Sequence, residues 1–338
     1  MNTSKASSRS RNHGVHLMVG FNGLTVEREL RNIIRDFEIG GIVLFRRNVE
    51  SPAQVSHLLA EAQDLARSHL GRPLLVAVDQ EGGPVQRFTP PFTQLPSARE
   101  LSLKGPEAVA RWAAVAAAEM KETGVHINFA PVLDLVPQSS DHFMRERTLG
   151  DSPEEVSSLG RTWIQALQTH GVSATGKHYP GLGSAESDPH HFAPVIHWED
   201  FQEKDRHLAP FQSAIEGGVH GLMTSHAKYP LLDREWPATL SPRINKEMLR
   251  HRLGFQGVLF SDDMDMAALC SHYSWDEMVC QGLEASIDFF LACQRSENIG
   301  PLHDALARAI SESSALKTMH RESLERVALL RKFHFPLV

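Results

Sequence analysis

The sequence of 338 residues predicts a (β/α)8 barrel of the TIM type, on three observations. Eight short, apolar and β-prone runs alternate along the chain with longer stretches of helical periodicity. The runs are continuously apolar, which is typical of parallel strands whose outer face is covered by helices. The length also suits a single barrel, in which such a sheet closes on itself.

The predicted strands and helices follow one another in alternation. The strands are expected at residues 16–21, 41–45, 74–78, 127–130, 172–177, 221–225, 257–261 and 287–292. The helices are expected at residues 26–37, 52–67, 106–123, 153–170, 198–216, 241–253, 274–285 and from 301 to the end. Residues 87–103 form the longest irregular stretch in this interpretation.

The predicted helix at residues 153–170 carries its own start and stop signals. Ser152 is a good N-cap, and Pro153 suits the first helical position. Glu155 completes a capping box with Ser152, and Gly171 ends the helix. These signals support the boundaries drawn from the apolar periodicity.

An open doubly wound sheet is the alternative fold. It is disfavoured because no Gly-x-Gly-x-x-Gly segment follows the first predicted strand. The sequence shows no internal repeat and no linker that would separate two domains. We therefore expect a disordered tail at residues 1–12 and one catalytic barrel domain at residues 13–338.

The composition argues against several classes of partner. A net charge of −7 without a dense basic tract disfavours nucleic-acid binding. Residues 1–12 lack the apolar core of a secretory signal, and no apolar run reaches the ~18 residues of a membrane span. The three cysteines form no Cys-x-x-Cys pair and indicate reduced thiols. We expect a cytoplasmic protein, a monomer or weak homo-oligomer, that acts on a small-molecule substrate.

Polar residues follow the carboxyl ends of most of the predicted strands. They are Arg46, Arg47 and Asn48, then Asp79, Gln80 and Glu81, then Asp134, Lys177 and His178, and finally Ser225, His226, Ser261, Asp262, Asp263 and Cys293. Active sites of these barrels lie at the carboxyl ends of the strands. Polar groups there cost stability unless they are paired or used, so the sequence predicts a polar pocket on this rim.

Asp262 is the best candidate for a nucleophile. It directly follows the apolar residues 258–260, so its carboxylate is expected at the mouth of the barrel. The side chain of Asp263 is expected to point the other way, because side chains alternate along a strand. Capping of the next helix is the simpler explanation for Asp263.

Three cations, Arg87, Arg147 and Lys177, can donate hydrogen bonds to hydroxyls or to a carboxylate. Taken alone, Arg147 is better explained as half of a surface ion pair. Asp79 and Arg87 flank a Gly-Gly turn, which is expected to let the backbone approach a ligand closely.

The polar segment after the fifth strand contains Asp188 and His190, two residues apart. This spacing lets a carboxylate bind one imidazole nitrogen and leave the other free for proton transfer. From the pair alone, a solvated surface loop is the commoner explanation. Six other histidines, in or beside predicted helices, are expected to be solvated: His57, His69, His170, His207, His251 and His320.

Several motifs resemble the glycoside hydrolase family 3 β-N-acetylhexosaminidases of the NagZ type. They occur in order over nearly the whole chain, up to Met266. They span residues 40–48, 78–83, 85–88, 128–134, 177–181 and 260–266.

The resemblance implies a retaining (β/α)8-barrel enzyme without a metal or cofactor. Its nucleophile would be Asp262, and its acid/base would be His190, oriented by Asp188 within the segment that corresponds to the Asp-Ser-His motif of the family. The residues that would bind the sugar are Asp79, Arg87, Arg147, Lys177 and His178. The implied substrates are peptidoglycan fragments in which GlcNAc is β-1,4-linked to 1,6-anhydro-N-acetylmuramic acid, as in cell-wall recycling.

This sequence departs from the family pattern at four positions. Pro84 stands where the family has Arg, and Leu182 replaces the His of a Pro-Gly-His-Gly turn. Pro189 replaces the Ser between Asp188 and His190, and Glu146 replaces the Asp before Arg147. None of these changes removes a catalytic group, but they bear on loop conformation and substrate preference.

Four alternative functions remain open at this point. A family 3 β-glucosidase would prefer glucose, and a GlcNAc phosphorylase would use phosphate, which a neutral histidine base does not repel. A metal-dependent amidohydrolase barrel would require a His-x-His pair ending the first strand, whereas His13 and His16 lie three residues apart at the start of that strand. A non-catalytic sugar-binding barrel would not require both Asp262 and His190.

Overall fold

The computed structural model describes residues 13–136, 142–184 and 194–336. Within these residues, eight parallel strands close into a barrel in the order β1, β2, β3, β4, β5, β6, β9 and β10, and β10 pairs with β1. The strands are β1 (Leu17–Val19), β2 (Gly41–Leu44), β3 (Leu75–Val78), β4 (Ile127–Asn128), β5 (Ser173–Tyr179), β6 (Gly221–Thr224), β9 (Val258–Asp263) and β10 (Phe289–Ala292). All eight lie where apolar runs predicted them, and the predicted fold class is confirmed. The predicted tail at residues 1–12 lies outside the described residues.

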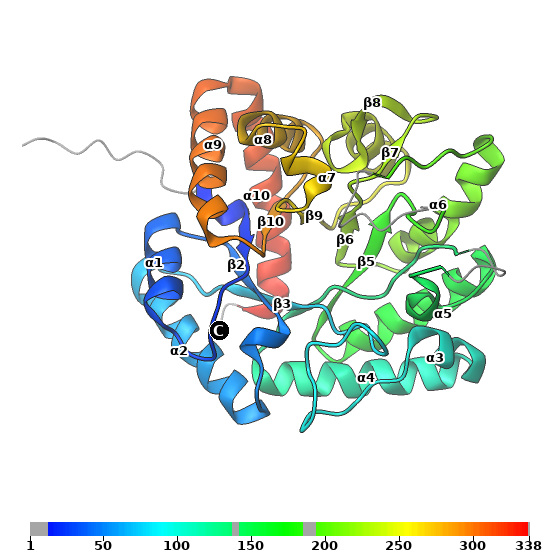
Figure 1. Ribbon diagram of the computed structural model, residues 1–338, viewed down its shortest axis with the longest axis horizontal. Coiled ribbons are helices and arrows are strands. Elements are labelled where there is room, and N and C mark those ends of the chain that lie inside the picture. Colours follow the sequence, from blue (N-terminus) through cyan, green and yellow to red (C-terminus); the bar gives the residue numbers. More distant parts are fainter. Residues whose placement is uncertain (1–12, 137–141, 185–193, 337–338) are drawn as a thin grey trace, which may run out of the picture.

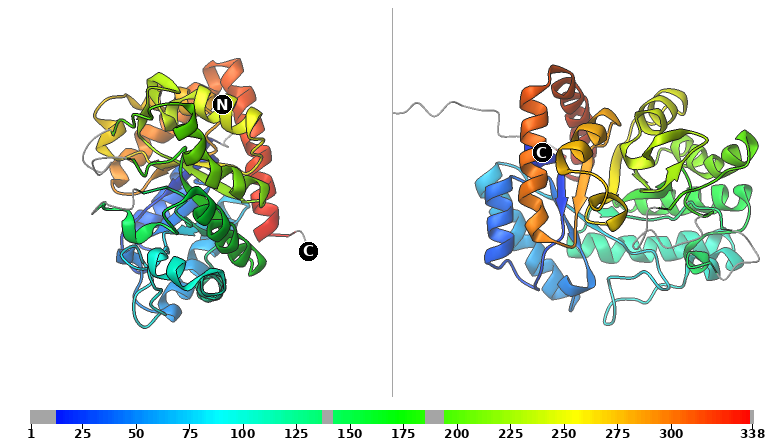
Figure 2. Two further views of the ribbon diagram at one scale, coloured as in Figure 1. Left: turned by 90° about the vertical axis from the view of Figure 1, so that its right-hand side faces the viewer. Right: turned by 45° about the horizontal axis from the view of Figure 1, so that its top comes forward.

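The helices lie outside the strands, as Figures 1 and 2 show. They are α1 (Arg28–Phe37), α2 (Pro52–Leu70), α3 (Ala98–Lys104), α4 (Pro106–Thr123), α5 (Pro153–Thr169), α6 (Phe201–Glu216), α7 (Ala267–Cys270), α8 (Trp275–Glu284), α9 (Ile299–Glu312) and α10 (Ser314–His334). Within the described residues, none is both long and apolar enough to cross a membrane.

Several features differ from the prediction, among them the short helix α7 at residues 267–270. Helix α3 occupies the end of the stretch at 87–103, where Ser97 and Glu100 form a capping box. The helix predicted at 241–253 is present as a π-helix, η5 (Arg243–Arg252). An antiparallel hairpin of β7 (Lys228–Tyr229) and β8 (Asp233–Pro237) follows β6. Its strands are short and polar, so they lack the apolar run that identified the barrel strands.

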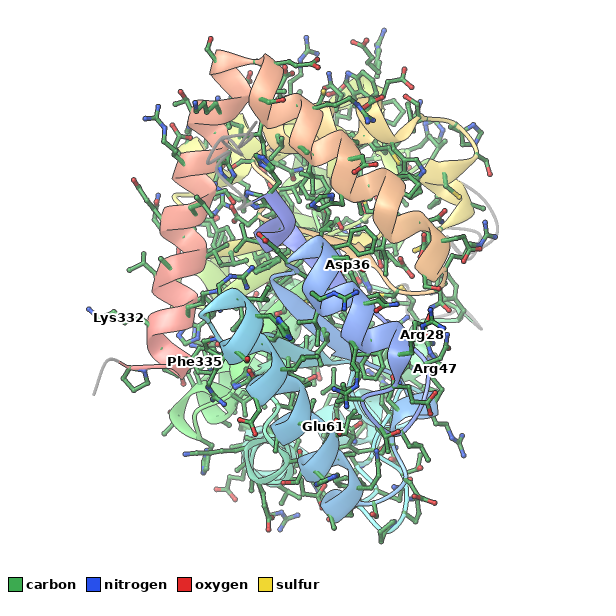
Figure 3. All side chains as sticks on the ribbon, turned by 90° about the vertical axis from the view of Figure 1, so that its left-hand side faces the viewer. Arg28, Asp36, Arg47, Glu61, Lys332 and Phe335 are labelled. Carbon is green, nitrogen blue, oxygen red and sulfur yellow. The ribbon has the colours of Figure 1, made fainter. Side chains whose placement is uncertain are left out.

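The barrel interior below the rim is filled with apolar side chains. Phe129 and Phe289 pack against Phe260, with ring centroids 5.3 and 5.4 Å apart. At the amino-terminal end of the strands, Leu330 of α10 and the following Phe335 pack against this interior cluster. Lys332 and Phe335 label the carboxyl end of α10 in Figure 3. The filled interior leaves the ends of the strands as the place for a site within the barrel, and in this fold the active site lies at the carboxyl ends.

Two histidines that the sequence suggested were solvated are buried. His320 on α10 lies with Nδ1 2.6 Å from Nε2 of the buried His16. His207 on α6 stacks on Trp198, with ring centroids 5.4 Å apart, and its Nε2 lies 3.1 Å from Ser184 Oγ. Both sit on inward-facing helix positions, which a count of polar residues does not reveal.

Burial also lowers the pKa of a group of histidines near the amino-terminal ends of the barrel strands. Ser173 Oγ lies 2.8 Å from His220 Nδ1 and 2.8 Å from His334 Nε2. Burial, with the neighbouring His126 and His220, lowers the pKa of His334 to about 3. Burial, with Arg331 and Arg67, lowers the pKa of His126 to about 4. These imidazoles are therefore neutral in the folded protein near pH 7.

The unfolding free energy is expected to decrease as the pH falls from 7.5 to 5. A histidine whose pKa is lower in the folded than in the unfolded chain favours unfolding once the pH drops below its ordinary value of 6.5. A histidine such as His334 would contribute about 2 kcal/mol of this loss at pH 5. Urea titrations at both pH values should show a smaller difference in unfolding free energy for His334→Gln than for wild type.

The matched control is His69→Gln, on the exposed end of α2, which should keep the wild-type difference. Equal pH dependence in wild type and His334→Gln would contradict this explanation.

Candidate active site

A cavity of about 190 Å³ opens at the carboxyl ends of the strands. Six residues predicted for the site line it: Asp79, Arg87, Arg147, Lys177, His178 and Asp262. A wider groove of about 1040 Å³ lies between α1, α9 and α10, away from these strand ends. We place the active site in the smaller cavity, because it brings together groups from four different strands and the loops that follow them.

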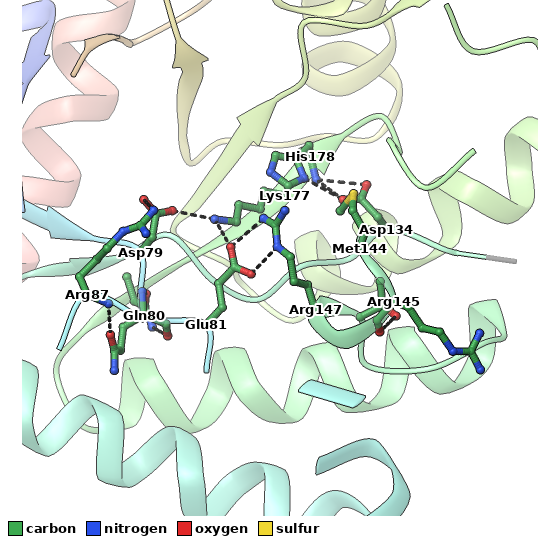
Figure 4. Close-up of polar contacts among 12 residues, drawn as sticks. Asp79, Gln80, Glu81, Arg87, Asp134, Met144, Arg145, Arg147, Lys177 and His178 are labelled. Carbon is green, nitrogen blue, oxygen red and sulfur yellow. Dashed lines mark hydrogen bonds and ion pairs between the residues drawn. The ribbon is translucent and has the colours of Figure 1, made fainter. Parts of the chain in front are cut away.

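A chain of buried ion pairs forms one wall of this cavity (Figure 4). Lys177 Nζ lies 2.7 Å from Asp79 Oδ1 and 2.6 Å from Glu81 Oε1. Both oxygens of Glu81 accept hydrogen bonds from Arg147, from Nε at 2.8 Å and from Nη2 at 2.9 Å. Burial alone would raise the pKa of Glu81, but Arg147 and Lys177 outweigh it and hold that pKa far below its usual value. The four side chains therefore form a fixed array of charges.

Taken alone, Arg147 was better explained as half of a surface ion pair. In the structure, its ion pair is largely buried. Its side chain is 17% exposed, and its partner Glu81 is 2% exposed. Burial would lower the pKa of Arg147, but the carboxylate of Glu81 raises it further above its usual range. The bidentate contact fixes the plane of the guanidinium, which suits it to recognise a polar ligand group.

Arg87 has hydrogen-bonding capacity to spare. Its Nη2 lies 3.5 Å from Asp79 Oδ2, and its backbone N–H donates to Gln80 Oε1 at 2.9 Å. Its Nε is buried and has no partner among the described residues. A bound sugar hydroxyl or carbonyl would satisfy this donor.

The Gly-Gly turn between Asp79 and Arg87 has a different role from the one predicted. Gly82 and Gly83 both have positive φ, 97° and 53°. A Cβ at Gly82 would lie 2.2 Å from the carbonyl oxygen of Pro96, and one at Gly83 would lie 2.6 Å from Cβ of Ser97. The glycines thus allow the turn to pack against residues 95–97, and neither lines the cavity.

His178 is oriented by Asp134, a residue at the end of the fourth predicted strand. His178 Nδ1 lies 2.8 Å from Asp134 Oδ2, and the backbone N–H of His178 donates to the same carboxylate. Asp134 Oδ1 also accepts the N–H of Leu182 at 2.6 Å. This carboxylate therefore fixes both the imidazole and the turn that follows β5.

Strand bulges explain why adjacent residues can both face the cavity. Along β5, Lys177 pairs with Met223 and Tyr179 with Thr224, so one extra residue is inserted on β5. His178 is that residue, and it lines the cavity together with Lys177. A bulge interrupts the alternation of side chains and re-aims the inserted one.

Strand β9 has the same irregularity at the predicted nucleophile. Phe260 pairs with Phe289 of β10, and Asp263 pairs with Leu291, so β9 carries one extra residue. Asp262 and Asp263 consequently both line the cavity. The expectation that Asp263 points the other way was wrong, because regular strand geometry does not persist there.

The two neighbouring carboxyls have different environments. Burial would raise the pKa of Asp262, but His226 and His178 and the N–H of Asp263 together lower it. Burial and the carboxylate of Asp265 raise the pKa of Asp263 to about 7. Asp263 Oδ1 also accepts backbone N–H groups, from Asp265 and from Cys293, each at 3.1 Å. Asp262 is thus the ionised carboxylate, and Asp263 supports the loops around it.

Glu81 was expected at the rim but without a role, and Asp265 was not among the predicted site residues. Glu81 stands two residues after Asp79, and this spacing is the signal that both side chains could share one face. Asp265 Oδ2 accepts the N–H groups of Gln294 and Arg295, and its Oδ1 accepts from Asn298 Nδ2 at 2.6 Å. These contacts fix the loop after β10, which nothing in the sequence around Asp265 indicates.

Asp188 and His190 lie outside the described residues, so the structure does not test their predicted role. Among residues 13–136, 142–184 and 194–336, no group of three His, Cys, Asp or Glu side chains is arranged to hold a metal ion.

Comparison with known proteins identifies the protein family to which this barrel belongs. The sequence pattern of the glycosyl hydrolase family 3 N-terminal domain matches residues 13–330. The chain therefore belongs to glycosyl hydrolase family 3, and it is a glycoside hydrolase. This finding confirms the family resemblance and goes against the amidohydrolase alternative.

Similar proteins include β-hexosaminidases, and similar solved structures include a β-N-acetylglucosaminidase. A β-hexosaminidase of Nitrosomonas eutropha is 35% identical over 327 residues, 94% of this chain and 92% of the relative. One of Nitrosospira multiformis is 40% identical over 267 residues, 77% of this chain and 74% of the relative. A family 3 β-N-acetylglucosaminidase from Paenibacillus superimposes with a TM-score of 0.90 at 34% identity. That alignment covers 96% of this chain and 62% of the Paenibacillus chain.

Proposed function

We propose that this chain is a retaining exo-β-N-acetylglucosaminidase that forms a glycosyl-enzyme intermediate on Asp262. The observation that carries the proposal is an ionised, half-buried carboxylate that lines a small cavity beside a fixed array of charged side chains. The names of the similar hexosaminidases support the choice of sugar. In this proposal residues 13–338 act as one catalytic domain.

The cavity suits one terminal sugar residue. Its volume of about 190 Å³ leaves room for a single ring, which favours an exo-acting enzyme. Asp79 and Lys177 can bind ring hydroxyls, while Arg87, Arg147 and His178 supply further donors around the ring. Lys177 stays charged, because Asp79 and Glu81 outweigh the effect of its burial and raise its pKa.

The proposed reaction has two steps. Asp262 attacks the anomeric carbon while His190 gives its proton to the departing glycosidic oxygen. His190 then takes a proton from water, whose oxygen attacks the same carbon and releases Asp262. Asp188 orients the imidazole and stabilises its charged form. No metal or cofactor takes part in either step.

The substrates proposed are peptidoglycan fragments in which GlcNAc is linked to 1,6-anhydro-N-acetylmuramic acid. The enzyme would act in the cytoplasm during cell-wall recycling. The family resemblance of the sequence motifs supports this assignment.

Turnover of two aryl glycosides tests the proposal. Purified enzyme should hydrolyse p-nitrophenyl β-N-acetylglucosaminide faster than p-nitrophenyl β-glucoside, with free GlcNAc as the product. Addition of phosphate should change neither the rate nor the product. A preference for the glucoside would indicate a β-glucosidase, phosphate-dependent formation of a sugar 1-phosphate would indicate a phosphorylase, and no turnover would support a sugar-binding barrel.

A further inference from the structure

An exposed aromatic ring stands at the edge of the cavity. Phe143, between β4 and α5, lines the cavity and yet is 40% exposed. Its ring stacks on that of His142, with centroids 4.5 Å apart and an angle of 28° between the planes. An aromatic ring left exposed beside a sugar site presents a flat apolar face to whatever occupies the rim.

The segment that carries Phe143 is fixed by its own contacts. The N–H of Met144 donates to His142 Nδ1 at 3.2 Å, and the N–H of Arg145 donates to the carbonyl of His142 at 2.9 Å. Met144 is fully buried. These hydrogen bonds and the buried Met144 hold the backbone that carries Phe143.

The same short segment also contributes a residue to the inner wall of the cavity. The 3-10 turn η3 (Arg145–Arg147) follows directly, and Arg147 reaches inward to Glu81. Phe143 and Arg147 thus stand four residues apart, one at the rim and one on the inner wall. When a sugar ring occupies the cavity, the leaving group attached to that sugar would lie at the rim.

We propose that Phe143 is the platform for the leaving group, against which a ring-shaped aglycone stacks its apolar face. The inference rests on the proposed function for the sugar in the cavity and adds the residue that receives the aglycone. The favoured aglycone is a pyranose or an aromatic ring, because a flat apolar face gains most from stacking on Phe143.

Substrates that share one sugar but differ in aglycone test this proposal. For each variant, kcat/KM is measured on methyl β-N-acetylglucosaminide, p-nitrophenyl β-N-acetylglucosaminide and β-1,4-linked GlcNAc disaccharide. Phe143→Ala should lose roughly 3- to 10-fold on the two ring aglycones, mainly through KM, and less than about 2-fold on the methyl glycoside. Phe143→Trp should restore the ring aglycones.

The control is Phe201→Ala on α6, which removes a ring that is 61% exposed and does not line the cavity. It should behave as wild type on all three substrates. Equal losses of Phe143→Ala on all three substrates, or no loss on any, would overturn the proposal. Failure of the proposed function would appear separately, as wild-type enzyme that does not cleave β-N-acetylglucosaminides, and the same ratios could then be measured with β-glucosides.

Discussion

Replacement of Asp262 by Asn is expected to lower kcat/KM for p-nitrophenyl β-N-acetylglucosaminide by at least about 10⁴-fold. The amide is nearly isosteric with the carboxylate, but it cannot attack the anomeric carbon to form a glycosyl-enzyme. The fold should persist, because Asp262 accepts one local hydrogen bond, from the N–H of Asp263 at 2.8 Å, and an amide oxygen can accept it too. Circular dichroism and the unfolding midpoint would verify this.

Asp263→Asn is the matched control on the adjacent carboxyl. Its Oδ1 accepts two backbone N–H groups, and the amide oxygen of Asn can accept both. The pKa of about 7 means that this side chain is partly uncharged near neutral pH already. The variant is therefore expected to lose less than about 10-fold, against the far larger loss for Asp262→Asn.

Two measurements identify the nucleophile directly. A fluorinated β-N-acetylglucosaminyl donor should label wild-type enzyme, and mass spectrometry of the peptides should locate the sugar on Asp262. Azide should restore turnover to Asp262→Ala and give the α-azide, because it attacks from the face that the carboxylate vacated. A label on Asp263 would move the nucleophile by one residue.

The sequence was a good guide to the barrel because each strand is a local apolar run. The strands at 41–45 and 74–78 needed only β-prone composition to be placed, and the structure has them as β2 and β3. The capping box of Ser97 and Glu100 that begins helix α3 is a local signal that the prediction did not use. The β7–β8 hairpin is short and polar, so its stability depends on packing against the rest of the chain. Local patterns carry little of that information.

The site shows the same difference between residues that local patterns placed and residues whose role depends on distant parts of the chain. Strand ends placed Asp79, Lys177 and Asp262 at the rim, since carboxyl ends of parallel strands meet on one side. The role of Glu81 depends on Arg147, 66 residues away, and no local pattern joins the two. Nor does any local pattern reveal the bulges on β5 and β9, which come from the pairing with neighbouring strands.

His190→Ala is expected to slow the first step by about 10²–10⁴-fold with a poor leaving group, such as the sugar of a GlcNAc disaccharide. With p-nitrophenol the loss should be much smaller, because this leaving group departs without a proton. Asp188→Asn should fall between wild type and His190→Ala, since it keeps the geometry but no longer stabilises the imidazolium. The ratio of kcat/KM values for the two substrates measures the effect.

Two groups in the described cavity compete with His190 for this role. His178 is held by Asp134 at 2.8 Å, as a proton-transferring histidine would be. The pKa of Asp263, about 7, would also suit an acid/base near neutral pH. Neither fits the proposal as well: His178 has a place in binding the sugar, and Asp263 is committed to backbone N–H groups.

The three candidates predict different dependence on the leaving group. His178→Gln should lower kcat/KM for both substrates by a similar factor, because the sugar is the same in each. Asp263→Asn should change the ratio little. If His190→Ala instead slows both substrates equally, and His178→Gln or Asp263→Asn is selective for the poor leaving group, then that residue delivers the proton and His190 only binds or shapes its loop.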